Sequence, residues 1–134
     1  MSSAVVPCVL KTRTFARWAR RERLPDAALR AAVDAIRRGL VDADLGGGLI
    51  KQRVARSGTG KRGGYRTLLA AGYGERWIFL YGFAKSERSN VDDEELRALR
   101  RLARTYLAMS ESTLMRLLDA GELMEVRNGA AEAS

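Results

Sequence analysis

The hydrophobic pattern of this chain changes its period at Leu49, and that change limits the folds open to it. Before this point, apolar residues recur at the spacing of a helix, as with Leu29, Val33 and Ile36. From residue 49 to residue 85 they follow a period of two, in the stretches LIKQRVAR, GYRTLLAAG and RWIFLYGFAK. Short loops join these stretches, so they predict three strands connected as antiparallel hairpins.

Further elements flank these hairpins. The apolar run at residues 4–10 predicts a strand, and Pro7 favours an edge position because it cannot donate to a ladder. Residues 11–24 and 25–39 predict two helices, with Thr12 or Thr14 capping the first. Residues 92–109 and 112–120 predict two more. Because helices must bury their apolar stripes, we expect an α+β fold: a small antiparallel sheet with the helices packed on one face, in the order strand, helix, helix, three strands, helix, helix.

The length of 134 residues suits one domain, and 46% apolar residues can supply its core. We expect this domain to span residues 1–126, and residues 127–134 to form a disordered tail. No apolar run has the length of a membrane helix and no secretory signal is visible, so we expect a cytoplasmic protein with no membrane partner. The single cysteine, Cys8, lies in an apolar run and is expected to be buried and inert.

Positive charge is concentrated in the first two thirds of the chain. The formal net charge is +8, and residues 1–84 carry 16 Lys and Arg against 6 Asp and Glu. Residues 85–134 carry 8 against 10. A small domain this basic usually meets a polyanion, most often nucleic acid, and an acidic protein is the next possibility.

The cations gather most densely between residues 51 and 66, where six Lys or Arg occur without any acid. Alternation puts Lys51 and Arg53 on one face of their strand. In the hairpin GTGKRGGYR, glycines allow positive φ and close approach of the backbone N–H groups to an anion. A solvated basic turn is the competing interpretation. The residues predicted here to grip phosphate are Arg56, Lys61, Arg62, Gly63, Gly64, Tyr65 and Arg66.

Aromatic residues alternate along the last predicted strand, at Trp77, Phe79, Tyr81 and Phe83, and are therefore expected on one face. Trp77 and Phe79 are expected in the core, whereas Tyr81 is a candidate for contact with RNA. Lys85 follows Phe83 with the same parity, so it could point across the sheet toward a phosphate.

The chain has no histidine and one cysteine, so we expect no zinc site, no other metal site and no cofactor. No Ser-His-Asp set and no carboxylate cluster occurs in the basic region. RNA permits catalysis without these groups, because its own 2′-hydroxyl is a nucleophile. Arginine and lysine can then stabilise the reacting phosphate, and a lysine or a tyrosine can move protons.

Residues 49–126 resemble the HigB-type branch of the RelE/ParE toxin superfamily. The stretches that carry this resemblance are KQRVARSGTGKRGGYRTLLA, RWIFLYGFAKSERSNVDDEELRALRRLA and LLDAGELMEV. The resemblance implies a RelE-like fold and the toxin of a type II toxin–antitoxin system. Such toxins typically cleave mRNA without metal, often on the ribosome, by attack of the 2′-hydroxyl. The implied partners are mRNA and a cognate antitoxin with a helix-turn-helix domain.

Carried over by motif, the resemblance implies a site made of Lys51, Arg53, Tyr65, Arg66 and Lys85. Arg53 and Arg66 would bind phosphate, Lys51 or Lys85 would act as acid or base, and Tyr65 would stack on a base or orient the phosphate. The chain departs from the pattern in two respects. Arg62 stands where many such toxins carry serine, and the histidine of ribonuclease relatives is missing.

Two alternatives remain open from the sequence. One is a toxin of the same superfamily without nuclease action, such as a gyrase poison, which the lack of histidine favours. The other is a basic nucleic-acid-binding module without catalytic activity.

Overall fold

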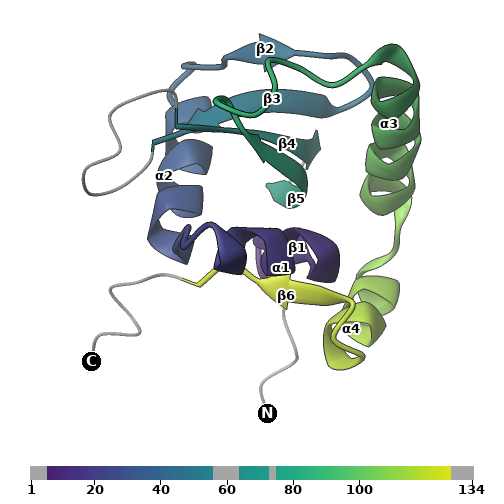
Figure 1. Ribbon diagram of the computed structural model, residues 1–134. Coiled ribbons are helices and arrows are strands. Elements are labelled where there is room, and N and C mark those ends of the chain that lie inside the picture. Colours follow the sequence, from purple (N-terminus) through teal and green to yellow (C-terminus); the bar gives the residue numbers. More distant parts are fainter. Residues whose placement is uncertain (1–5, 56–63, 73–74, 128–134) are drawn as a thin grey trace.

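The structure, a computed structural model, describes residues 6–55, 64–72 and 75–127. Its strands are β1 (Val9–Thr12), β2 (Ala43–Asp44), β3 (Leu49–Val54), β4 (Tyr65–Gly72), β5 (Arg76–Ala84) and β6 (Leu123–Glu125). They form one sheet with the order β2-β3-β4-β5-β1-β6 (Figure 1). The three predicted hairpin strands are β3, β4 and β5, which pair antiparallel as expected.

The helices are α1 (Arg13–Arg21), α2 (Asp26–Arg37), α3 (Asp93–Ala108) and α4 (Glu111–Asp119). Side chains cap three of them, as the sequence suggests for polar residues before helical stripes. The Thr12 hydroxyl accepts a hydrogen bond from the Phe15 amide at 3.1 Å, and Ser110 caps α4 in the same way. Asp92 and Glu95 form a capping box on α3. Within the described residues, no helix has the length and apolar character needed to span a membrane.

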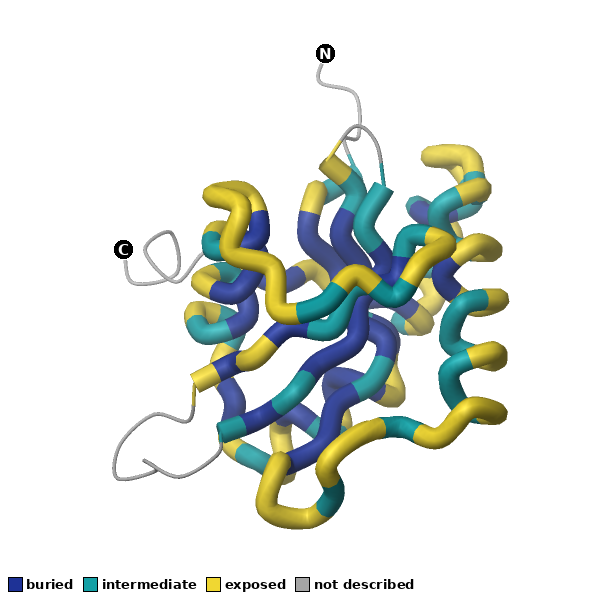
Figure 2. Tube along the Cα trace, turned by 90° about the horizontal axis from the view of Figure 1, so that it is seen from above, coloured by how far each residue is buried: buried dark blue, intermediate teal, exposed yellow. Residues whose placement is uncertain are grey.

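Helices cover both faces of the sheet, which confirms the α+β class but not the expected packing on one face. Phe15, Leu29 and Val33 from α1 and α2 form one core with alternate strand residues. Ala103 from α3 and Leu114 from α4 form a second core with the other strand residues. Figure 1 shows α2 and α3 on opposite sides of the strands, and Figure 2 shows the buried strands between the outer helices. The reason is visible in the middle of β4 and β5, where consecutive apolar residues such as Leu68 and Leu69 must be buried on both faces.

The sheet is mixed rather than wholly antiparallel, because β1 runs parallel to β5. β1 also pairs with β6, so it is an internal strand and not the edge strand that Pro7 suggested. Pro7 precedes β1 and therefore removes no bond from its ladder. Cys8 also precedes the strand and is exposed, which corrects the expectation of a buried thiol.

A β-bulge divides the aromatic residues of β5 between the two faces. Leu69 pairs with Phe79 and Leu68 pairs with Tyr81, so Leu80 is an extra residue in β5. Trp77 and Phe79 therefore join the core under α1 and α2, as predicted for core residues. Phe83 lies in the other core, and Tyr81 packs against it. The expectation that all four aromatics share a face is wrong, because one inserted residue reverses the alternation.

Candidate nucleic-acid interface

Cationic and aromatic residues from three neighbouring strands share one face of the sheet at one end. Arg53 of β3 pairs with Arg66 of β4, which in turn pairs with Phe83 of β5. One rung further in, Lys51 and Tyr81 flank Leu68 in the same way. Residues opposite each other in a ladder project to the same face, so the side chains of these two rungs share one face, although Leu68 and Phe83 are buried in it. We call this surface, made of Lys51, Arg53, Arg66, Tyr81 and Phe83, the cationic face.

The cations of this face differ in their exposure. Arg53 is exposed and Lys51 is half-buried. The Arg66 side chain retains 13% of its accessible surface, and its Nε atom lies 3.7 Å from Asp42 Oδ2. That separation is longer than a hydrogen bond, so this is a loose ion pair. Asp42 therefore brings one negative charge to a face that otherwise attracts anions.

Lys85 lies at the margin of the cationic face, next to the hairpin that leads into β4. Its amide donates to the Gly64 carbonyl at 3.1 Å, which continues the β4–β5 ladder one step beyond β5. The Lys85 side chain is exposed, and Gly64 has a φ of +61°, as predicted for this turn. The predicted binding residues Arg56, Lys61, Arg62 and Gly63 lie outside the described part of the chain.

The structure separates Tyr65 from the other predicted catalytic residues. Tyr65 precedes Arg66 in β4, so its side chain points to the opposite face, where it is 2% exposed. Its hydroxyl donates to the Glu22 carbonyl at 3.2 Å, and its ring meets Trp18 edge-on at 5.5 Å. These contacts belong to the core between the sheet and α1, and they leave Tyr65 no path to a phosphate on the cationic face.

Arg88, which no sequence pattern indicates, lies against the aromatic residues of the cationic face. Its guanidinium donates to Glu95 at 2.6 Å and to the Tyr81 hydroxyl at 3.2 Å, and it lies over the Phe83 ring. The hydrogen bond from Arg88, together with one from the Asp92 amide, lowers the pKa of Glu95 below its usual range. Arg88 lies in the polar break SERSN, where no periodicity marks it. Its position four residues after the end of β5, close in sequence to the aromatic residues of that strand, was the only available signal.

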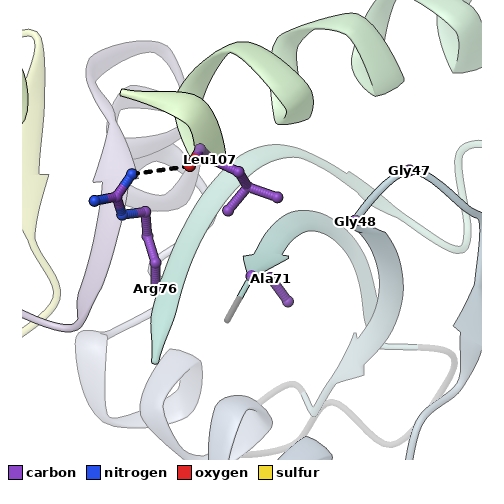
Figure 3. A pocket seen from close by; sticks show the side chains of 6 residues that line it. Gly47, Gly48, Ala71, Arg76 and Leu107 are labelled. Carbon is purple, nitrogen blue, oxygen red and sulfur yellow. Dashed lines mark hydrogen bonds between the residues drawn. The ribbon is translucent and has the colours of Figure 1, made fainter. Parts of the chain in front are cut away.

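A cavity lies at the opposite end of the sheet from the cationic face, and its lining is mostly glycine and apolar residues. This cavity of about 620 Å³ is lined by Gly47, Gly48, Ala71, Gly72, Arg76 and Leu107 (Figure 3). Arg76 donates to the carbonyls of Tyr106, Leu107 and Met109 at 2.8 to 3.1 Å, so it caps the C-terminus of α3. Its charge is therefore used within the fold. Among the described residues, no cluster of three or more His, Cys, Asp or Glu could hold a metal ion.

Comparison with known proteins agrees with this architecture. A search of curated proteins gives no match. A family model described as the RelE toxin of the RelE/RelB toxin–antitoxin system matches residues 8–126, which include every strand and helix of the structure. The chain therefore belongs to the RelE toxin family.

Proposed function

We propose that this toxin is a metal-independent endoribonuclease that cleaves mRNA, in the manner of the HigB-type branch that its motifs resemble. The observation that carries the proposal is the shared face of Lys51, Arg53 and Arg66 on two neighbouring strands. Three cations within two rungs can hold one phosphate from two sides and stabilise the charge that develops in a pentavalent transition state.

The reaction that this set of residues can support is an internal transfer within RNA. The 2′-hydroxyl oxygen attacks the adjacent phosphorus, the bond to the 5′-oxygen of the next nucleotide breaks, and a 2′,3′-cyclic phosphate forms. A base takes the proton of the 2′-hydroxyl, and an acid returns a proton to the leaving 5′-oxygen. No further reactant is needed, and the chain, which has no histidine, offers Lys51 and Lys85 for the proton steps.

Within this proposal, Arg53 and Arg66 bind the reacting phosphate. Tyr81 offers its aromatic ring to the RNA, and a hydrogen bond from Arg88 to the Tyr81 hydroxyl fixes the position of this ring. Tyr65 has no catalytic role, because it is buried in the opposite core. The expected partners are mRNA on the ribosome and a cognate helix-turn-helix antitoxin. Of these partners, the described residues support only a polyanion such as mRNA, because the cationic face attracts negative charge.

The test uses purified protein, mRNA and ribosomes, with EDTA present. We expect fragments that end in 2′,3′-cyclic phosphate and begin with a 5′-hydroxyl. The matched control is Arg20→Gln/Arg38→Gln, which removes two exposed cations from α1 and from the end of α2, away from the cationic face, and is expected to cleave like the wild type. Intact mRNA, with or without ribosomes, would contradict the proposal. DNA breaks on induction with intact mRNA would instead indicate a gyrase poison.

A further inference from the structure

A cleft lies where α1 passes the end of β5, around the strand edge from the cationic face. β1 pairs with β5 only as far as Phe79, because the chain then enters α1 at Arg13. On the side of β1, the remaining part of β5 therefore faces α1, whereas its other edge still pairs with β4. Between them is a cavity of about 350 Å³, a size that suits a small planar ligand.

The α1 side of this cleft is cationic. Arg17 and Arg21 both line it, are one helical turn apart and are exposed. α1 contains no acidic residue, and like charges one turn apart destabilise a helix. Within the described residues, none of the ion pairs involves Arg17 or Arg21. Ion pairs within the described fold therefore do not occupy these two guanidinium groups, which can donate hydrogen bonds to acceptors of a ligand.

The floor of the cleft is aromatic and fixed in position. The Trp18 ring lies directly on Gly82, where an added Cβ atom would come within 2.3 Å of it. Phe15 and Tyr65 hold the same ring at centroid distances of 5.3 and 5.5 Å. Trp18 is nevertheless only half-buried, so part of it remains accessible from the cleft. An immobilised aromatic ring flanked by arginines is the arrangement that binds bases of single-stranded nucleic acid.

The cleft continues the cationic face. Phe83 belongs to the rung of Arg53 and Arg66 and also lines the cleft. One strand spacing, about 5 Å, separates the backbone of Arg66 from that of β5. An extended RNA chain that passes from Arg66 across β5 therefore reaches the cleft within a few nucleotides.

We propose that this cleft binds one nucleobase of the RNA whose phosphate lies on the cationic face, and that it selects guanine. The inference rests on the proposed function. The oxygen O6 and nitrogen N7 of guanine accept hydrogen bonds from guanidinium groups, which Arg17 and Arg21 supply. Its N1–H and N2 amino group donate, and Glu87, an exposed carboxylate that lines the cleft, can accept both. Adenine has no donor at these two positions.

Glu87 also argues against the main competing occupant, an acidic peptide such as a segment of the antitoxin. A carboxylate in the cleft repels such a peptide but complements a base that carries donors. The combination of donors from Arg17 and Arg21 with the acceptor Glu87 therefore favours a base, and binding of the antitoxin there becomes an outcome of the test.

The experiment measures binding of short 2′-O-methyl RNA oligomers, which cannot be cleaved by 2′-hydroxyl attack. They contain a single guanine, inosine or adenine in a uridine background, and fluorescence anisotropy reports affinity across salt concentrations. For Arg17→Gln/Arg21→Gln we expect an affinity about tenfold lower for the guanine oligomer and loss of the preference for guanine, with a salt slope close to that of the wild type, because these arginines contact a base and not a phosphate. The control Arg20→Gln/Arg38→Gln has the same net charge and is expected to keep the wild-type affinity and preference.

Glu87→Gln separates base recognition from charge. We expect it to reduce the preference for guanine over adenine and to retain binding of both oligomers. Wild-type protein should bind inosine less tightly than guanine, because inosine lacks the N2 amino group.

Equal losses in the Arg17/Arg21 and control variants, or no preference for guanine in the wild type, would overturn the inference. So would a loss of antitoxin binding without a loss of RNA binding. The proposed function fails separately: selective binding of the oligomers without cleavage of natural mRNA would refute the nuclease and leave the guanine cleft standing. If substitutions at Arg17, Arg21 and Glu87 leave the rate and the sequence preference of cleavage unchanged, the guanine cleft is refuted and the nuclease stands.

Discussion

Arg53 and Arg66 stand directly opposite each other on β3 and β4, on the face of the sheet that also carries Lys51. Like charges opposite each other in a ladder are unfavourable, so the fold tolerates a local cost at this rung. Asp42 lies 3.7 Å from Arg66 and relieves part of this repulsion. A bound phosphate would relieve more of it.

Replacement of Asp42 by asparagine should strengthen RNA binding. The substitution removes a carboxylate that pairs with Arg66 and preserves the size of the side chain. We expect a several-fold rise in affinity for uncleavable RNA, together with a small loss of thermal stability. Asp44→Asn, an exposed site two residues along, is the control. An unchanged affinity in Asp42→Asn would show that Asp42 does not compete with the ligand for Arg66.

Exchange of lysine for arginine should distinguish proton transfer from charge at Lys51 and Lys85. Arginine keeps the positive charge but cannot give up its proton in a protein. If one of these lysines is the acid or base, its arginine variant should lose about 10² to 10⁴ in cleavage rate and keep its RNA affinity. Single-turnover cleavage and anisotropy measure the two quantities. Full cleavage in both variants would exclude a lysine from the proton steps.

Tyr65→Phe should affect stability and not chemistry. The hydroxyl of Tyr65 donates to the Glu22 carbonyl in the core, far from the cationic face. We expect a loss of about 1 kcal/mol in the free energy of unfolding, measured by urea denaturation. The cleavage rate of the folded variant should equal that of the wild type. A large fall in rate at unchanged stability would restore Tyr65 to the active site and contradict its assigned place.

The Arg88–Glu95 pair should make stability depend on pH in the acid range. Hydrogen bonds from Arg88 and the Asp92 amide lower the pKa of Glu95 in the folded state. Its contribution is therefore present above the pKa of the unfolded chain, about 4.3, and is lost as pH falls through the lower folded pKa. The stability difference between wild type and Glu95→Gln should shrink below about pH 4. A difference that is constant from pH 7 to pH 3 would contradict this assignment.

The hairpins and the helices could be predicted from the sequence because local patterns encode them. The period-two run of β3 and the apolar stripe of α2 persist in the structure. β2 and β6 have only two and three residues, too few for any period to show. The parallel pairing of β1 with β5 joins segments that are far apart in the sequence, so it depends on the tertiary packing and not on a local pattern.

The candidate site was predictable to the extent that strand alternation holds. Lys51, Arg53 and Arg66 share a face because residues 49–54 of β3 pair with β4 in a regular register, so side chains alternate between the two faces in both strands. The extra residue Leu80 breaks alternation in β5, and no residue type announces such a bulge. Tyr65 was assigned by motif although its parity, next to Arg66, already placed it on the other face. The position of Arg88 could not be predicted, because it follows the turn after β5, where strand alternation no longer applies.

The rate at which Arg53→Gln cleaves translated mRNA, compared with Arg38→Gln, tests the cationic face most directly. Both residues are exposed, both substitutions remove one positive charge, and only Arg53 lies on the rung with Arg66. We predict that Arg53→Gln loses about 10² in cleavage rate and that Arg38→Gln remains within about twofold of wild type. Equal rates in the two variants would show that RNA is not cleaved on this face.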